Sequence, residues 1–332
     1  MPGADELGPD EEIVAGRRPV EEVFAARRSA LRLLVTPGRR HALEQIVLHA
    51  TTLRIPIVEV EGGTLTALSG FDGHQGVAVV VAPRRFASIE EVLARSIERA
   101  EPPFVLVLDS LEDPQNLGTV LRSAEAAGAH GVVFPTARQA PLTPAAVKVS
   151  AGATEHLLLC PVDDLPAALA DLHARGLRIV GSEADAPLTA READLRGPVA
   201  IVLGSEGHGL SPVVRRRCDL MIRIPMRGAI GSLNAAVAGS ILLFEAAGQR
   251  DPSPRPGPTT DDPGPIAGVA PSSRPKARSS AARSRPAAAA RPARTSPRAA
   301  SAGSDPGGQA GSGEPAAPDE VDILPRAPDG SA

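Results

Sequence analysis

The stretch "VAIVLGSEGHGL", residues 199–210, joins a continuous apolar run to a glycine-rich loop. A strand that is apolar at every position is typical of a parallel sheet covered by helices on both faces. Other strand candidates share this texture, and helical stretches separate most of them: "FVLVLDSL", "GVVFP", "LLLCPV", "RIVGSE" and "LMIRIPM". The sequence therefore predicts a parallel-sheet α/β domain over residues 103–250.

A smaller α/β domain is predicted ahead of this sheet, over residues 13–83. Its first helix is expected in "GRRPVEEVFAARRSA", which has a proline near its first turn, and short apolar strands alternate with further helices. Residues 84–102 are predicted to form a linker helix, because Ser88 and Glu91 have the spacing of a capping box.

Residues 251–332 differ in composition from the rest of the chain. Pro, Ala, Gly and Ser dominate there, and none of the six Phe falls in this segment. Such a segment buries too little apolar surface to offset the entropy of ordering, so we expect a disordered tail. The run from Arg274 to Arg298 holds eight basic residues and no acidic one. It could bind RNA phosphates loosely, although a solvated tail of biased composition is the favoured reading.

The remaining composition narrows the class of protein. The net charge is −4, and the two cysteines, Cys160 and Cys218, have no metal-ligand spacing. No apolar run is long enough to span a bilayer, and the acidic N-terminus lacks the apolar core of a signal peptide. We therefore expect a cytoplasmic protein without a metal or a membrane partner.

Three loops that follow strand candidates carry the polar chemistry. Ligands of open parallel sheets bind beyond the carboxyl ends of the strands, so these loops could face one site. Taken one at a time, each has a plainer explanation. Asn116 could cap a helix that begins near it, Ser232 could cap a helix that begins at Leu233, the glycines could form a tight turn, and Arg122 could be a surface residue. The residues singled out are Asn116 and Arg122 in the first loop and helix, Gly204, Glu206 and Gly207 in the second, and Ser232 and Asn234 in the third. The second loop lacks both the dinucleotide-binding glycine fingerprint and the P-loop pattern, which disfavours a dehydrogenase.

The three segments together resemble the motifs of the SpoU-type (TrmH/RlmB) RNA ribose 2′-O-methyltransferases of the SPOUT superfamily. The matching stretches are "DPQNLGTVLRSAEAAG", "IVLGSEGHGL" and "IPMRGAIGSLNAAVAGSILLFE", with "VKVSAGATEHLLL" between the first two. The N-terminal segments "GRRPVEEVF" and "HQGVAVVVAP" look like the substrate-binding domain of the branch that methylates guanosine in bacterial 23S rRNA. The resemblance spans about residues 13–248.

The resemblance implies a C-terminal trefoil knot, S-adenosylmethionine as cofactor and a homodimer with the site near its interface. Matched position by position, it implies that Gly204, Ile224 and Leu233 contact the cofactor, while Glu206, Gly207 and Ser232 line the same pocket. The catalytic pair of the family corresponds to Asn116 and Arg122. Glu206 and Asn234 would help to organise the site.

The role of Arg122 stays open at this stage. A guanidinium remains protonated in proteins and is a poor base unless its surroundings are unusual. Holding an RNA phosphate and stabilising the developing alkoxide is the safer role.

Target choice is expected to come from the N-terminal domain, through arginines that contact phosphates. The candidates are Arg17, Arg18, Arg27, Arg28, Arg39 and Arg40. Because the chain has no Trp or Tyr, no aromatic stacking platform is evident. A guanosine of 23S rRNA is the preferred substrate. The alternatives are a tRNA or resistance-type rRNA methyltransferase acting at another site, and a non-catalytic RNA-binding ribosome-assembly factor.

Overall fold

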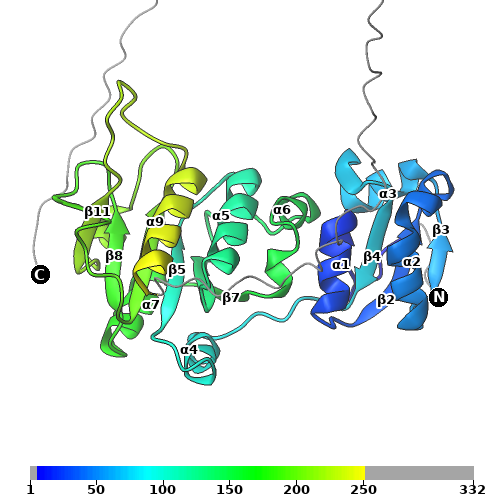
Figure 1. Cartoon of the computed structure of the whole chain (residues 1–332), viewed down its shortest axis with the longest axis horizontal. Helices are drawn as coiled ribbons and strands as arrows, with labels where there is room; N and C mark the ends of the chain where they lie inside the picture. The colour runs from blue at the N-terminus through cyan, green and yellow to red at the C-terminus, as the bar shows by residue number, and fades with distance from the viewer. Residues whose placement is uncertain (1–5, 251–332) are drawn as a thin grey trace, which may run out of the picture. The chain divides into compact units, whose positions relative to one another are not determined.

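The computed structural model describes residues 6–250, which hold two sheets with their helices (Figure 1). The tail predicted for residues 251–332, with its basic run, lies outside the described residues. The predicted α/β class, with a parallel sheet behind an N-terminal α/β part, is confirmed. The C-terminal knot stays a prediction.

A seven-stranded sheet organises the C-terminal part. Its strand order is β7-β6-β5-β10-β8-β11-β9, and all the neighbouring strands pair in parallel. The strands are β5 (Phe104–Asp109), β6 (Gly131–Pro135), β7 (Leu158–Val162), β8 (Arg178–Ser182), β9 (Leu188–Thr189), β10 (Val199–Gly204) and β11 (Leu220–Arg223). The helices are α4 (Ile89–Glu98), α5 (Pro114–Ala126), α6 (Pro144–Val149), α7 (Leu165–Ala174), α8 (Pro212–Arg215) and α9 (Ala235–Arg250), with a 3-10 turn, η3 (Ala153–Glu155).

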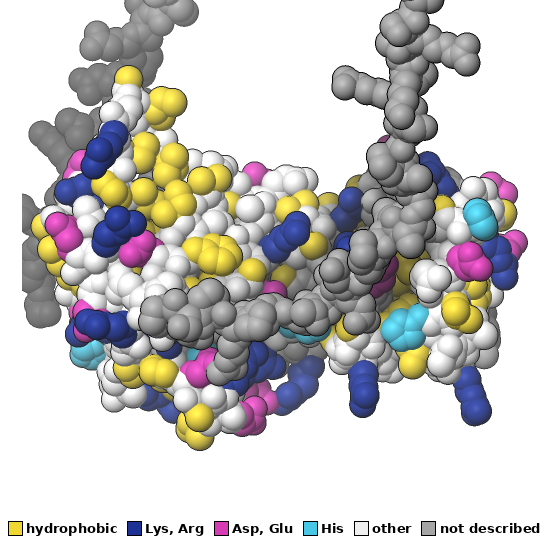
Figure 2. All heavy atoms as spheres, viewed as in Figure 1, with side chains coloured by type: hydrophobic (Ala, Val, Ile, Leu, Met, Phe, Trp, Pro, Cys, Tyr) yellow, Lys and Arg dark blue, Asp and Glu magenta, His cyan; other side chains and the backbone are white. Residues whose placement is uncertain are grey.

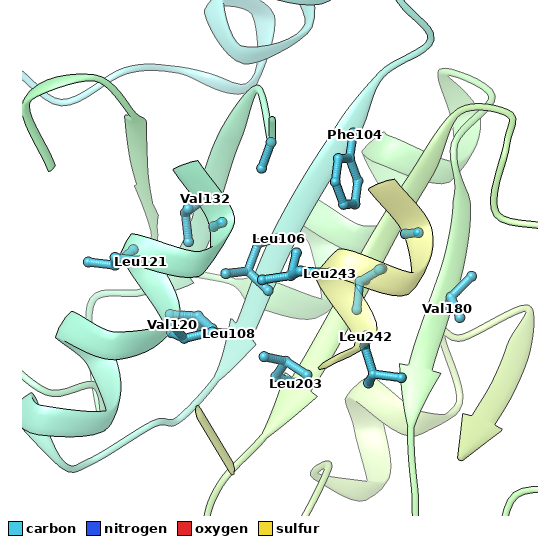
Figure 3. Close-up of a cluster of buried hydrophobic side chains, with 14 of the residues drawn as sticks. Phe104, Leu106, Leu108, Val120, Leu121, Val132, Val180, Leu203, Leu242 and Leu243 are labelled. Carbon is cyan, nitrogen blue, oxygen red and sulfur yellow. The ribbon is translucent and has the colours of Figure 1, made fainter. Parts of the chain in front are cut away.

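The continuous apolar runs are explained by burial on both faces of this sheet. In β5, Phe104, Leu106 and Leu108 enter a core shared with α5 and α9 (Figure 3). The alternate residues Val105 and Val107 enter a second core, formed with α4 and α7. All five side chains are at most 1% exposed, so no polar residue is tolerated along the strand.

The strand order reverses direction at β5 and β10. From β5 the chain moves outward to β6 and β7, then crosses to β8, and β10 returns to lie between β5 and β8. Such a reversal leaves a crevice at the carboxyl ends of the two strands. In the register of this pair, Gly204 at the end of β10 lies opposite Asp109 at the end of β5. The loops that carry the predicted site residues begin at these two positions.

The N-terminal part has a four-stranded mixed sheet of order β1-β4-β2-β3, with helices on both faces. In β4, Val77, Val79 and Val81 pack toward α1 and α2, whereas Ala78 and Val80 pack toward α3. The elements are β1 (Glu12–Ala15), α1 (Arg17–Ala25), β2 (Ala30–Val35), η1 (Pro37–Leu43), α2 (Glu44–Thr52), β3 (Ile57–Glu59), α3 (Gly62–Ser69), η2 (Asp72–His74) and β4 (Val77–Val81).

None of the helices within residues 6–250 has both the length and the apolar character that a membrane crossing requires.

Gly118 and Gly248 give a matched test of the close packing beneath the site. A Cβ at Gly118 in α5 would lie 2.5 Å from the carbonyl oxygen of Ala146, so the backbones of α5 and α6 would have to separate. Gly118→Ala should therefore lower the free energy of unfolding by about 1–3 kcal/mol. At Gly248 in α9 a Cβ would meet nothing within 4 Å, so Gly248→Ala should be neutral or raise it by up to about 1 kcal/mol.

Denaturant titration of the two variants checks this pair. If both substitutions stabilised the protein alike, the tight α5–α6 contact would be wrong.

Candidate active site

Helix α5 begins earlier than the sequence suggests, and this changes the role of Asn116. The expected start was near Asn116, with that residue as a possible cap. Instead Asp113 caps the helix by accepting a hydrogen bond from Gln115 N, and Pro114 takes the first helical position, where no N–H is needed. The Asn116 side chain is therefore available inside the first turn, and it is 8% exposed.

Asn116 joins the other two loops through hydrogen bonds. Its Nδ2 donates to Glu206 Oε1 at 2.8 Å, in the loop after β10. Its Oδ1 accepts from Asn234 Nδ2 at 2.9 Å, in the loop before α9. One nearly buried amide thus connects segments 90 and 118 residues away in the chain.

Asn234 fixes the direction of this chain of amides. Its Oδ1 accepts from the backbone N–H groups of Ala236 and Val237, at 3.0 and 3.2 Å, and so caps α9. Its Nδ2 must then point toward Asn116, which in turn must present oxygen to Asn234 and nitrogen to Glu206. Helix α9 begins at Ala235, two residues later than the start expected at Leu233, and the cap considered for Ser232 belongs to Asn234.

The loop after β10 is a closed turn that leaves no room for a side chain at Gly204, the residue that ends the strand. Ser205 and Gly209 exchange two backbone hydrogen bonds, and Gly209 has φ +65°. A Cβ at Gly204 would lie 2.1 Å from the carbonyl carbon of Gly209, so only glycine fits. Gly207, in contrast, is exposed, and a Cβ there would meet nothing within 4 Å.

Asp109 is a participant that the sequence analysis did not single out. It is 5% exposed, and its Oδ2 accepts a hydrogen bond from Ser211 N at 2.7 Å, which ties the end of β5 to the far side of the β10 loop. The available signal was an acidic residue that directly ends a fully apolar strand.

The remaining residues proposed for the cofactor lie in the segment between β11 and α9. Ile224 is partly buried and packs against the core shared by α5 and α9. Ser232 is exposed, and Leu233 is 39% exposed. Glycines 228 and 231 in this segment would admit a Cβ without meeting any atom within 4 Å. Open glycine backbone therefore occurs in two neighbouring loops, which suits a ligand held largely through main-chain atoms.

Arg122 is not part of the amide chain. It lies on the exposed side of α5, and within residues 6–250 its side chain makes no hydrogen bond or ion pair. Six residues along an α-helix turn its side chain about 120° from that of Asn116. Thus Asn116, Glu206 and Asn234 come together, and Arg122 points elsewhere.

Thiolate chemistry finds no support among the described residues. Burial raises the pKa of the Cys160 thiol to about 11 and that of Cys218 to about 12. Both thiols are therefore protonated at neutral pH. Residues 6–250 contain no group of three or more His, Cys, Asp or Glu side chains suited to a metal ion.

Comparison with known proteins identifies the family. Residues 103–244 match the SpoU rRNA methylase family, and residues 13–87 match the RNA 2′-O ribose methyltransferase substrate-binding domain. An uncharacterized tRNA/rRNA methyltransferase of Mycolicibacterium vanbaalenii is 40% identical over 243 residues, which cover 73% of this chain and 77% of the relative. The chain belongs to the SpoU family of RNA methyltransferases.

Other SpoU-family relatives agree with this assignment. The TrmH-family protein YacO of Bacillus subtilis is 42% identical over 179 residues, or 54% of this chain and 72% of the relative. Among solved structures, the SpoU methyltransferase AviRb of Streptomyces viridochromogenes, crystallised with S-adenosylmethionine, superposes with a TM-score of 0.62 at 26% identity. That match covers 73% of this chain and 91% of AviRb.

The cap and the link made by Asn234 can be separated by substitution. Asn234→Ala removes both and should lower the free energy of unfolding by about 1 kcal/mol. Asn234→Asp keeps an oxygen for the α9 cap but loses the donor to Asn116, so it should unfold close to wild type. Thermal melts of both variants provide the measurement. Equal losses in the two would show that the cap contributes nothing.

Proposed function

We propose that this SpoU-family enzyme transfers the methyl group of S-adenosylmethionine to a ribose 2′-OH of RNA. The observation that carries the proposal is the hydrogen-bonded chain of Asn234, Asn116 and Glu206, which brings one polar residue from each of the three motif segments to the strand reversal. The match of residues 13–87 to a substrate-binding domain of RNA 2′-O-methyltransferases supports an RNA substrate. We favour a guanosine of 23S rRNA because "GRRPVEEVF" and "HQGVAVVVAP" resemble the branch that methylates it.

The cofactor would be held by the two glycine-bearing loops. When bound, S-adenosylmethionine supplies a methyl group on a positively charged sulfur, which is already electrophilic. Gly204 and Gly207 in the β10 loop and Ile224, Ser232 and Leu233 before α9 are the residues that we propose to contact it. The open backbone of these loops supports the fit.

The protein's own task is then to orient the 2′-OH and to assist loss of its proton. Glu206 Oε1 is engaged by Asn116, while Oε2 has no hydrogen bond among the described residues. We propose that the ribose hydroxyl donates to Oε2. The chain of amides, anchored on the N–H groups of α9, fixes the carboxylate for this role.

Arg122 would act in a dimer. Four apolar residues on and before α9 are 39–51% exposed and share one face: Leu233, Val237, Ile241 and Phe244. Figure 2 shows apolar side chains gathered over α9 and the loop before it. Ser123, next to Arg122 in the chain, bonds Ser240 of α9 at 2.7 Å, so α5 packs beside the helix that carries this stripe and Arg122 is exposed one residue from that contact. A second copy packed on the stripe would bring Arg122 to the seam, where it can hold RNA phosphate and stabilise the developing alkoxide.

The proposal is tested by mapping ribose methylation on rRNA and tRNA from cells with the gene, without it and with Arg122→Ala. We expect one 23S rRNA guanosine to lose its 2′-O-methyl group without the gene and with Arg122→Ala. The purified variant should bind S-adenosylmethionine within about twofold of wild type by calorimetry, because Arg122 lies outside the proposed cofactor loops. An unchanged rRNA pattern would overturn the 23S rRNA assignment, and a lost tRNA methyl group would favour the tRNA alternative.

The dimer is tested by placing a charge on the apolar stripe. Ile241→Glu should give a monomer with little methyl transfer, because an unpaired carboxylate would have to be buried at the seam. The matched control is Ile97→Glu in α4, where the side chain is 79% exposed and lies outside the stripe. Light scattering coupled to gel filtration measures the mass of each variant. A dimeric Ile241→Glu protein would refute this interface.

A further inference from the structure

An open cavity of about 470 Å³, lined by several polar side chains, lies in the N-terminal part, and none of its lining residues belongs to the three methyltransferase motifs. The loop after β2 and the turn before β4 form its walls, and the first residues of α3 complete it. The lining residues that bear on its chemistry are Arg39, Glu61, Asp72, His74, Gln75 and Gly76. Its volume falls within the range of about 300–1,000 Å³ that is usual for sites that hold small ligands.

The cavity walls are held rigidly by unusual backbone. Gln75 has φ +58°, a left-handed conformation that is uncommon outside glycine, and Gly76 follows with φ +80°. A Cβ at Gly76 would lie 2.7 Å from Thr36 Oγ1 and from Arg39 Cγ, so the two walls meet closely at this residue. Thr36 N also donates to the carbonyl of Gly76 at 2.9 Å. Strain of this kind persists where the surroundings fix one shape, which is common at ligand sites.

A chain of hydrogen bonds defines the polar groups on one wall. Gly76 N donates to His74 Nδ1 at 3.0 Å, so the proton of the neutral ring is on Nε2. Nε2 then donates to Thr66 Oγ1 at 3.3 Å, and the Thr66 hydroxyl donates to Asp72 Oδ1 at 3.0 Å. Asp72 Oδ2 has no hydrogen bond to any described residue and remains an acceptor.

The other polar groups complete a mixed pattern. Glu61 is exposed, and its carboxylate makes no hydrogen bond or ion pair within residues 6–250. Gln75 Oε1 accepts from Arg17 N at 3.1 Å, and its amide N–H₂, which has no hydrogen bond to any described residue, remains a donor. Arg39 adds a guanidinium. With two carboxylates against one cation, the cavity does not suit a phosphate and instead suits a neutral group that both donates and accepts.

We propose that this cavity binds an unpaired base of the RNA substrate, with guanine as the best fit. This inference rests on the proposed function. The N1–H and N2–H₂ groups of guanine would donate to Glu61 or Asp72, and its O6 would accept from Arg39 or Gln75. The base would be a recognition element separate from the nucleotide that is methylated, so the cavity contributes to the choice of target. The exposed Arg17 and His41 are available to the flanking phosphates, whereas the guanidinium of Arg40 is paired with Glu59.

The direction in which a charge-removing substitution changes the affinity for RNA distinguishes base recognition from general electrostatic repulsion. Removing a negative charge near RNA should strengthen binding if the carboxylate only repels phosphates. If Glu61 accepts hydrogen bonds from a base, Glu61→Gln must weaken binding instead. Glu98→Gln is the matched control, because it removes the same charge from an exposed residue of α4 that does not line the cavity.

The experiment uses the full chain and ribosomal RNA isolated from a strain that lacks the gene. Glu61→Gln and Asp72→Asn should each raise the KM for this RNA about tenfold, the factor that corresponds to loss of one charge-assisted hydrogen bond, with kcat and the affinity for S-adenosylmethionine nearly unchanged. Glu98→Gln should leave the KM equal or slightly lower. A KM for Glu61→Gln that matches the control would overturn the proposal.

Photo-cross-linking gives a readout that does not need catalysis. RNA that carries 6-thioguanosine should cross-link to the peptide with residues 72–76 in the wild-type protein, and the yield should fall in Glu61→Gln. Cross-links confined to other segments would refute base binding in this cavity, even if methylation is intact. Cross-linking at residues 72–76 without any methyl transfer would instead retain the pocket and reject the proposed enzymatic function.

Discussion

The burial of the parallel sheet on both faces is the constraint that organises the methyltransferase part. Strands such as β5 and β10 have side chains in two separate cores, so neither face can carry a polar group. Polar chemistry is therefore confined to the positions where strands end. Asp109 and Gly204 lie opposite each other at such a position. The strand order reverses there, so the loops that follow the two strands lead away in opposite directions and leave space between them.

Close backbone approach then turns adjacent loops into one site. Gly118 lets α6 pack against α5, Gly204 lets the β10 loop close on itself, and Gly239 lets α9 approach Leu203 and Val120. These contacts bring together the first turn of α5, the β10 loop and the start of α9. The side-chain amides of Asn116 and Asn234 can then link the three segments by hydrogen bonds. Because each amide has a donor end and an acceptor end, the N–H groups of α9 set the orientation of Asn234, then of Asn116, and finally of the Glu206 carboxylate.

The two parts of the protein suit different features of an RNA. In the proposed mechanism, the loops at the carboxyl ends of β5 and β10 would offer a carboxylate to a hydroxyl and open backbone to a cofactor, and neither feature distinguishes one base from another. The cavity of the N-terminal part offers a donor and acceptor pattern that matches the edge of a base, with arginines beside it for phosphates. Base recognition and ribose chemistry would thus be carried by different residues, as expected when the reacting group carries no sequence information.

The sequence by itself determined the parallel α/β class and the strand ends where polar residues gather, because two-sided burial leaves a continuous apolar run that stops where a loop begins. Resemblance added the family, since three ordered motifs are far more specific than any one. The tertiary structure alone decided which polar residues meet. Asn116 was expected as a possible cap and instead bonds across 90 and 118 residues of chain, and Arg122, six residues on, faces away from it. Such pairings depend on the side chains' direction and on contacts between distant segments, neither of which leaves a period or a spacing in the sequence. The cavity of the N-terminal part was hidden for the same reason, since its walls come from three separate segments of the chain.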